Sequence, residues 1–274
     1  MLKFSYTVGM PDTYGRMFAY QGDVDRFLSV LAELGYDAIE AFVRDVDALD
    51  LPWLERLLAR TGLEVASVGT SPIATCDKLT LLDADAEVRA AAVARCKKHV
   101  DMAERFHSAV NIGRFRGTCP AEVPREISLA RLHDALAELS EYAAKKNVRL
   151  SLEPQNRQNL NNLNSTREAA DWLRAAGIPN LGLLLDTFHM YAEDPSMEAA
   201  LVDAGDLLCY FHFADQNRGW PGSGAINFPN LLRVAASLGY DGYVTMEIAQ
   251  LPDAETAARR SIEYLRGIAA AQQG

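Results

Sequence analysis

Four polar residues in the second half of the sequence recur at nearly regular intervals. Glu153, Asp186, His212 and Glu247 are separated by 33, 26 and 35 residues, and each lies at or near the end of a short apolar run. Each interval is close to the length of one strand-plus-helix unit, about thirty residues. Because parallel strands meet at one edge with their carboxyl ends, four consecutive strands would each direct one oxygen or imidazole group toward a common centre.

Taken singly, each of these residues has an ordinary explanation, since a strand-end carboxylate often caps a helix and a lone histidine often packs in a core. As a set they do not, because three carboxylates brought together in a low dielectric cannot all remain ionised. A divalent cation supplies the missing positive charge. Three carboxylates and one imidazole suit Mn²⁺ or Mg²⁺ better than a structural Zn²⁺ site, and Co²⁺ also fits. The sequence predicts one divalent metal ion, with Mn²⁺ as the first choice.

Two further polar residues lie close to this set. His189 follows Asp186 by three residues, where packing within the loop and contact with a substrate are both open. Arg218 follows His212 by six residues and precedes the turn-rich segment PGSG (221–224). It is either an ordinary surface cation or, on a loop at the rim of a site, a fixed fork of donors for hydroxyl or carboxylate groups.

Short apolar runs alternate with longer amphipathic stretches along the chain. Several runs are apolar almost throughout, which is typical of parallel strands covered on both faces. The predicted strands are residues 3–9, 37–43, 64–70, 109–115, 148–153, 181–186, 207–213 and 243–248.

Helical periodicity separates these runs. Residues 24–35 carry apolar side chains at helical spacing and end at Gly35, a residue favoured just after a helix. Ser165 and Glu168 have the spacing of a capping box. Further helices are predicted at residues 85–106, 129–146 and 254–270.

Eight strand–helix alternations follow one another without a linker or a change in composition. They predict an α/β fold, a (β/α)₈ TIM barrel, in a single domain spanning residues 1–274. An open doubly wound sheet is the alternative. It would ordinarily have fewer strands and often a glycine-rich phosphate-binding turn, and the sequence contains neither GxGxxG nor GxxxxGK[ST].

Composition restricts the partners. The 274 residues include 27 Lys+Arg and 37 Asp+Glu, a formal net charge of −10, which argues against a nucleic-acid-binding protein. The four cysteines form no CxxC pair, so a reducing compartment is expected. MLKFSYTVGM has no signal-peptide pattern, and no uncharged apolar run approaches the ~18 residues of a membrane span. We expect a cytoplasmic enzyme with a small-molecule substrate, without nucleic acid or membrane as partner.

Four motifs surround the residues named first: EPQNR (153–157), LLLDTFHM (183–190), HFADQNRGWPGSGAINF (212–228) and VTMEI (244–248). Together they resemble the xylose-isomerase-like barrel superfamily. Within it they are most similar to the ketose 3-epimerases of the tagatose/psicose type and to the related 5-keto-L-gluconate epimerase. The resemblance covers nearly the whole chain, since it extends upstream to residues 41–47, 67–89 and 110–117.

The resemblance implies that the four residues named first are the metal ligands. It further implies that Glu153 and Glu247 are the acid/base pair, that His189 and Arg218 contact substrate oxygens, and that the protein is a homodimer or homotetramer. Where the family commonly has a second Glu six residues after the first ligand, this chain has Asn159. An amide both donates and accepts hydrogen bonds and would not repel an anion. With Asn159 at this position, the substrate could be a keto-uronate as well as a simple ketose.

Such an enzyme removes a proton from the carbon beside a ketone and returns it elsewhere. A divalent ion bound to the carbonyl and the adjacent hydroxyl would acidify that proton and stabilise the enediolate. If Glu153 takes the proton from one face of C3 and Glu247 returns one to the other face, the product is the C3 epimer. This chemistry needs no nicotinamide, pyridoxal phosphate or flavin, so no nucleotide cofactor is expected.

Other functions stay open at this point. A hydroxypyruvate- or aldose–ketose-type isomerase would use the same metal site and return the proton to the neighbouring carbon, and a sugar dehydratase is a less favoured third reaction. An AP-endonuclease-like nuclease of the same superfamily gathers several metal ions with extra histidines. Here the predicted strand ends SVGT (67–70) and NIGR (111–114) supply no histidine or acid. A non-catalytic sugar-binding barrel would need no acid/base pair.

Overall fold

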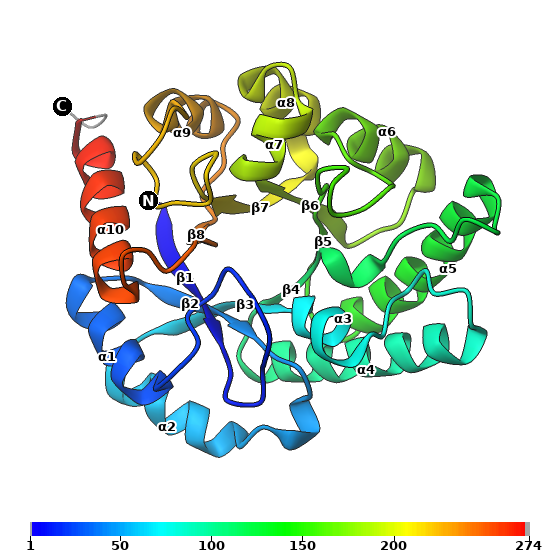
Figure 1. The fold of residues 1–274 in the computed structure, drawn as a ribbon, viewed down its shortest axis with the longest axis horizontal. Coiled ribbons are helices and arrows are strands. Elements are labelled where there is room, and N and C mark those ends of the chain that lie inside the picture. Colours follow the sequence, from blue (N-terminus) through cyan, green and yellow to red (C-terminus); the bar gives the residue numbers. More distant parts are fainter. Residues whose placement is uncertain (1, 272–274) are drawn as a thin grey trace.

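The computed structural model describes residues 2–271 and closes eight parallel strands into a barrel (Figure 1). Each strand pairs with the next along the chain, and the ring closes where Lys3 lies beside Tyr243. The predicted barrel is confirmed. Its strands are β1 (Lys3–Gly9), β2 (Ala38–Phe42), β3 (Glu64–Gly69), β4 (Ala109–Ile112), β5 (Leu150–Leu152), β6 (Leu181–Asp186), β7 (Leu208–Phe213) and β8 (Tyr243–Met246).

Every predicted strand is present, but five end one to three residues earlier than the apolar pattern indicated. The run at 109–115 is wrong beyond Ile112, because the chain turns at Gly113 into the 3-10 helix η2 (Arg114–Arg116). β5 ends at Leu152 and β8 at Met246. Glu153 and Glu247 therefore lie one residue beyond their strands, at the carboxyl end of the barrel where connecting loops form the site.

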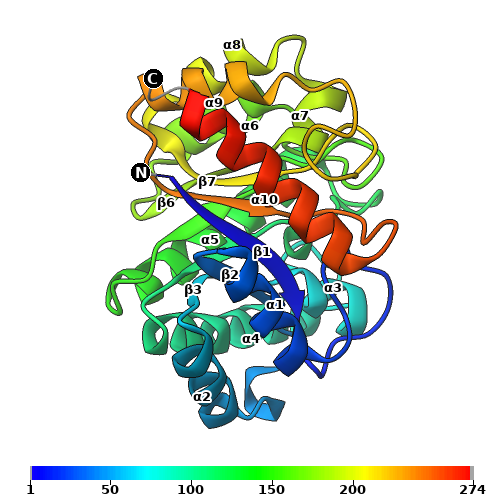
Figure 2. The same cartoon turned by 90° about the vertical axis from the view of Figure 1, so that its left-hand side faces the viewer.

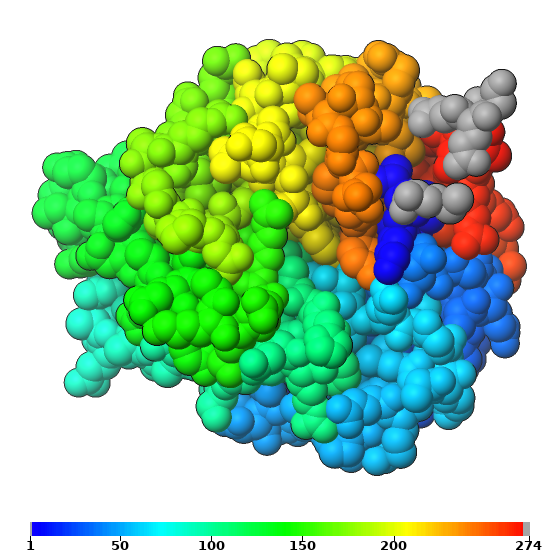
Figure 3. Space-filling model, turned by 180° about the vertical axis from the view of Figure 1, so that it is seen from behind, coloured from blue at the N-terminus to red at the C-terminus, as the bar shows by residue number. Residues whose placement is uncertain are grey.

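Helices surround the barrel in sequence order, as the succession of colours around the molecule shows (Figures 1 and 3). The α-helices are α1 (Val24–Leu34), α2 (Leu51–Thr61), α3 (Ser71–Asp77), α4 (Ala86–Arg105), α5 (Arg125–Ala144), α6 (Thr166–Ala176), α7 (Thr187–Glu193), α8 (Met197–Ala204), α9 (Phe228–Ser237) and α10 (Ala254–Ala271). Two further 3-10 helices are η1 (Val46–Ala48) and η3 (Gly205–Leu207). The last helix, α10, contacts α1, so the first and last helices lie side by side (Figure 2).

The helix boundaries follow the signals in the sequence. Gly35 ends α1 in the left-handed conformation with φ of 85°, which is why a glycine is favoured there. The Ser165 hydroxyl accepts a hydrogen bond from the Glu168 amide, as the capping box predicts. The Glu168 carboxylate reaches back to the Asn164 amide (2.8 Å) instead of that of Ser165. Within residues 2–271, each helix is too short or too polar to span a bilayer.

The inside of the barrel contains a polar layer that the apolar strand patterns did not indicate. Asn111 donates to the Ser67 hydroxyl (2.8 Å) and accepts from that of Ser151 (2.6 Å). The Tyr210 hydroxyl lies 3.1 Å from that of Ser67 and accepts from that of Thr245 (2.7 Å). All five side chains are buried, so their polar atoms depend on one another as partners. Such a network fixes the side chains that form the floor of the barrel's mouth.

Candidate metal centre

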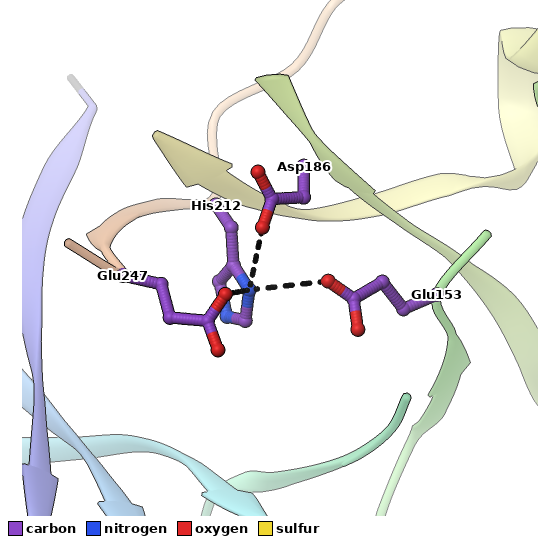
Figure 4. A group of neighbouring side chains, drawn as sticks. All are labelled: Glu153, Asp186, His212 and Glu247. Atoms are coloured by element: carbon purple, nitrogen blue, oxygen red, sulfur yellow. Dashed lines mark ion pairs between the residues drawn. The ribbon is translucent and has the colours of Figure 1, made fainter. Parts of the chain in front are cut away.

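The four residues singled out by their spacing converge at the carboxyl ends of β5 to β8 (Figure 4). His212 Nδ1 lies 3.6 Å from Glu153 Oε1, 3.9 Å from Asp186 Oδ2 and 3.5 Å from Glu247 Oε2. One possible ligand atom from each residue lies within 4.8 Å of the other three. In the described part of the chain this is the one cluster of three or more such groups.

The atoms that face the centre of this cluster fit a divalent ion. Glu153 Oε1, Asp186 Oδ2, His212 Nδ1 and Glu247 Oε2 are all buried. Glu153 Oε1 and His212 Nδ1 have no hydrogen-bond partner, while Asp186 Oδ2 and Glu247 Oε2 are paired with Arg218 Nη1 at 2.7 and 2.8 Å. Unpaired buried polar atoms are costly, and three neighbouring carboxylates repel one another. A single divalent ion would partner all four atoms and offset the negative charge. Oxygen donors with one imidazole suit Mn²⁺ or Mg²⁺.

Asp186 and Glu153 are each held in place by the carboxylate oxygen that faces away from the cluster. Asp186 Oδ1 accepts from the Phe188 amide (2.8 Å) and so caps the first turn of α7. Glu153 Oε2 accepts from Gln155 Nε2 (2.5 Å). The other oxygen of each residue is left facing the cluster, so the local fold orients both groups before any ion binds.

Glu40 orients the imidazole and was missed by the sequence analysis. It lies in the middle of β2, is 1% exposed, and its Oε2 is 2.8 Å from His212 Nε2. The histidine therefore donates its Nε2 proton to Glu40 and directs the Nδ1 lone pair to the cluster. Burial acts to lower the pKa of His212, but Glu40 and Glu247 outweigh it and hold that pKa well above its usual value. The detectable signal was one acid inside the apolar run AIEAF (38–42).

Arg218 is buried beside the cluster, so the surface-cation alternative is wrong. Its guanidinium lies between the rings of Phe18 and Phe188, at 4.8 and 4.4 Å from their centroids. Nη1 is 2.7 Å from Asp186 Oδ2 and 2.8 Å from Glu247 Oε2. The same atom donates to the main-chain oxygen of Glu247 (2.8 Å), so Arg218 contacts both the side chain and the main chain of Glu247.

His189 also lies at the cluster. It is 2% exposed on α7, and its Nδ1 accepts from Asn156 Nδ2 (3.0 Å). Its Nε2 lies 3.3 Å from Arg218 Nη2 and 3.8 Å from Glu153 Oε1. Burial, with Arg218 acting in the same direction and Asp186 opposing, lowers the pKa of His189 to about 3. The ring is therefore neutral at physiological pH.

A cavity of about 370 Å³ opens above the cluster, large enough for a small sugar. His189, Arg218 and Glu247 reach its wall, and Asn159 lies there too. The structure thus brings together the four spacing residues and all three predicted substrate-binding residues. The remaining lining residues are Arg16, Met17, Phe18, Phe42, Ser71, Thr75, Arg114 and Gln155.

Comparison with known proteins identifies the family to which this chain belongs. The model of a family described as "Xylose isomerase-like TIM barrel" matches residues 28–268. The chain belongs to this family. It is 30% identical over 221 residues to an L-ribulose 3-epimerase of Methylomonas sp. strain DH-1, covering 79% of this chain and 75% of that one. It is 29% identical over 218 residues to a ketose 3-epimerase of Arthrobacter globiformis, covering 78% and 74%.

The fold of this family member is also found in solved structures. The apo 3-keto-D-glucoside 4-epimerase of E. coli superposes with a TM-score of 0.81 at 20% identity, covering 97% of this chain and all of that one. At this identity the likeness concerns the fold. The two relatives named above place the chain among the epimerases of the family, an isomerase-class enzyme.

Glu40→Gln is expected to weaken Mn²⁺ binding by about ten- to a hundredfold, the usual effect of removing the partner of a metal-bound histidine. Glutamine keeps the shape of the side chain and can still accept from His212 Nε2, but it lacks the charge that raises the basicity of Nδ1. Titration calorimetry of the stripped protein with Mn²⁺ measures the change. Glu33→Gln, an exposed position on α1, is the control. If Glu40→Gln and Glu33→Gln bound Mn²⁺ with equal affinity, Glu40 would have no part in metal binding.

Gly113→Ala is expected to damage the same site by a steric route. A Cβ at Gly113 would overlap Glu153 Oε2 and lie 2.9 Å from Gln155 Nε2, so the carboxylate would have to move. We expect Mn²⁺ affinity to fall at least tenfold, because ligand geometry within a fraction of an ångström determines affinity. Gly267→Ala on α10, where a Cβ meets nothing within 4 Å, is the matched control. Calorimetric affinities that agree between the two variants would contradict this contact.

Proposed function

We propose that this protein is a divalent-metal-dependent epimerase that acts beside the ketone of a ketose or keto-uronate through an enediolate intermediate. The observation that carries this proposal is the convergence of four buried ligand atoms, three of them carboxylate oxygens, at the floor of a sugar-sized cavity. The names of the two curated relatives, both ketose 3-epimerases by activity, support the same reaction class.

Glu153 and Glu247 are the acid/base pair in this proposal. They come from β5 and β8, and their carboxylates approach the cluster from opposite sides (Figure 4). A divalent ion held by Glu153, Asp186, His212 and Glu247 would supply Lewis acidity at the ketone. With a substrate between the two glutamates, one removes the proton from one face of the carbon and the other returns a proton to the opposite face. Transfer between opposite faces inverts the carbon, which is an epimerisation.

The other three residues bind and orient the substrate. Neutral His189 contacts a substrate oxygen next to Glu153. Arg218 fixes the Glu247 carboxylate and, from the cavity wall, contacts the oxygens of the sugar. Asn159 offers an amide that both donates and accepts to hydroxyl groups farther along the cavity.

Proton exchange in D₂O tests the proposal. Mn²⁺-loaded and metal-stripped protein are compared by NMR on a panel of ketoses and keto-uronates. Deuterium at the carbon beside the ketone, a C3 epimer as product and loss of both on stripping are the expected results. An aldose product would make the protein an isomerase on the same site, and loss of water a dehydratase. Absence of exchange on every panel member would overturn the proposal.

The remaining features of the proposal concern the whole molecule. We propose Mn²⁺ as the native ion, no nucleotide cofactor, a cytoplasmic location, one domain over residues 1–274 and a homodimer or homotetramer. Light scattering tests the oligomer, and a single species at the chain mass of 30.1 kDa would contradict it. A nuclease is disfavoured by the net charge of −10 and by the single ligand cluster among residues 2–271. Cleavage of an abasic-site duplex by the loaded protein would reverse that judgement.

A further inference from the structure

The cavity above the metal cluster has an excess of positive charge in its exposed part. Its lining includes three arginines, Arg16, Arg114 and Arg218, and one carboxylate, that of Glu247. Glu247 is already paired with the buried Arg218 at 2.8 Å. Arg16 and Arg114 are exposed and have no acidic residue opposite them in the lining. The two guanidinium groups therefore face the cavity without a counter-charge.

Neither arginine is neutralised elsewhere. Within residues 2–271, Arg16 and Arg114 take part in no ion pair, although the chain has an excess of acids that gives it a net charge of −10. Other arginines do find acids, as Arg44 does with Asp77 (2.7 Å) and Arg105 with Glu55 (2.6 Å). The one contact of the Arg16 guanidinium is with the Phe18 ring, whose centroid is 5.9 Å away. Both groups are therefore available to a ligand.

A second cavity, of about 360 Å³, continues this basic surface. It shares Thr75, Arg114 and Asn159 with the first cavity, adds Lys78, and has no acidic residue in its lining. Arg114 thus lies where the two cavities meet. The uncharged polar side chains in its lining are the hydroxyls of Thr75, Thr80 and Thr118 and the amide of Asn159, which bind anionic and neutral oxygens without repelling either.

The main chain before Arg114 passes the reacting end of the site, and the Arg114 side chain reaches the second cavity, whose lining contains none of the four cluster residues. The preceding residue, Gly113, lies so near Glu153 that a Cβ there would overlap its carboxylate. With a divalent ion bound, the charges of Glu40, Glu153, Asp186 and Glu247 are balanced by the ion, Arg218 and the buried Arg116, which donates to the main-chain oxygen of Glu153. The inner site then has no formal excess to attract or repel an anion, and the selectivity for charge comes from the two exposed arginines.

From these observations we infer that the substrate is anionic: a ketose that carries a carboxylate or a phosphate at the end away from its ketone, bound by Arg114 with Arg16. An arginine fork forms paired, charge-assisted hydrogen bonds with either group. This inference rests on the proposed epimerase function and narrows its substrate class. It assigns Arg114 and Arg16 to specificity, and the proton transfer stays with the two glutamates.

Binding to matched sugars tests the inference. Calorimetry with the Mn²⁺-loaded protein compares D-fructose with D-fructuronate, which has a carboxylate at C6, and with D-fructose 6-phosphate. We expect at least one anionic sugar to bind at least ten times more tightly than fructose. Which of the two binds more tightly shows whether the site prefers a carboxylate or a phosphate. Arg114→Gln is expected to reduce that preference by about ten- to a hundredfold, the value of hydrogen bonds to a charged group. Arg114→Lys keeps the positive charge and should retain part of the preference for the anionic sugar.

The control is Arg259→Gln, an exposed arginine on α10 that lines neither cavity and should leave the preference unchanged. Raising the salt concentration should weaken the anionic sugar more than fructose. Equal binding of all three sugars, or an equal loss for all three in Arg114→Gln, would overturn the inference. Deuterium exchange in the same samples separates the two proposals. Exchange without a preference for charge leaves the epimerase standing, a preference without exchange leaves the anion site standing, and no binding of any sugar ends both.

Discussion

Glu247→Gln is expected to reduce the rate of epimer formation by about a thousandfold at saturating Mn²⁺. General acid–base catalysis contributes about 10²–10⁴ to a rate, and an amide cannot carry the proton. The variant should bind Mn²⁺ more weakly than the parent but measurably, because three ligands and one amide oxygen remain. Epimer formation followed by NMR at several Mn²⁺ concentrations separates the loss of the proton carrier from the loss of metal.

Isotope exchange makes this prediction sharper. If Glu153 and Glu247 each serve one face of the carbon, Glu247→Gln should still exchange deuterium into the epimer whose proton faces Glu153. Glu153→Gln should exchange only into the other epimer, and neither variant should interconvert the two. Glu263→Gln, an exposed acid on α10, is the control and should keep the parent rate. Parent-level epimer formation by Glu247→Gln would disprove the two-carboxylate mechanism.

Removal of the metal is expected to abolish activity and to lower the melting temperature by about 5–10 °C. The ion binds only where the fold brings the three carboxylates and the imidazole together, so it stabilises the folded state. An ion present at a hundred times its dissociation constant adds about 2.7 kcal/mol. For a domain of 150–250 residues, each kcal/mol shifts the melting temperature by about 2–4 °C. Calorimetric scans of stripped and Mn²⁺-loaded protein measure the shift.

A pair of aspartate variants tests whether the shift comes from this cluster. Asp186→Asn should lose most of the stabilisation by Mn²⁺, because an amide replaces a carboxylate that faces the ion. Asp206→Asn, an exposed position on η3, should keep it. Activity that survives stripping to a few per cent of residual metal, or a stabilisation that persists in Asp186→Asn, would show that the cluster is not the metal site.

The order of the strands and helices was available from the sequence. Apolar runs and helical periodicity are local patterns, and each strand of a parallel barrel is buried on both faces. The interval of about thirty residues between Glu153, Asp186, His212 and Glu247 placed them on four successive strands. Since successive strands of a barrel are neighbours, regular spacing in the sequence became proximity in space. His189 and Arg218 were singled out by their positions after Asp186 and His212, and the resemblance to the epimerase motifs assigned them contact with substrate oxygens; the structure brings both to the cluster.

The interactions that orient these side chains depend on the tertiary structure. Glu40 and His212 are 172 positions apart, and nothing local to either indicates that they form a hydrogen bond. Arg116 is fully buried, donates to the main-chain oxygen of Glu153, and binds the side chain of Asn162 46 positions away at 2.9 Å. In the sequence it is one of several arginines. Barrel closure determines which strands face each other across the interior, and this decides which polar groups become partners.

The charge of the cavity wall also depends partly on the sequence and partly on the tertiary structure. The sequence by itself determined the barrel, the ligand types and the chemistry they permit, because residue type and periodicity are properties of the chain. The tertiary structure alone decided that Arg218 is buried between two rings while Arg16 and Arg114 face the cavity without acidic partners. The physical reason is that burial and charge balance depend on the summed surroundings of a side chain, which come from loops far apart in the sequence.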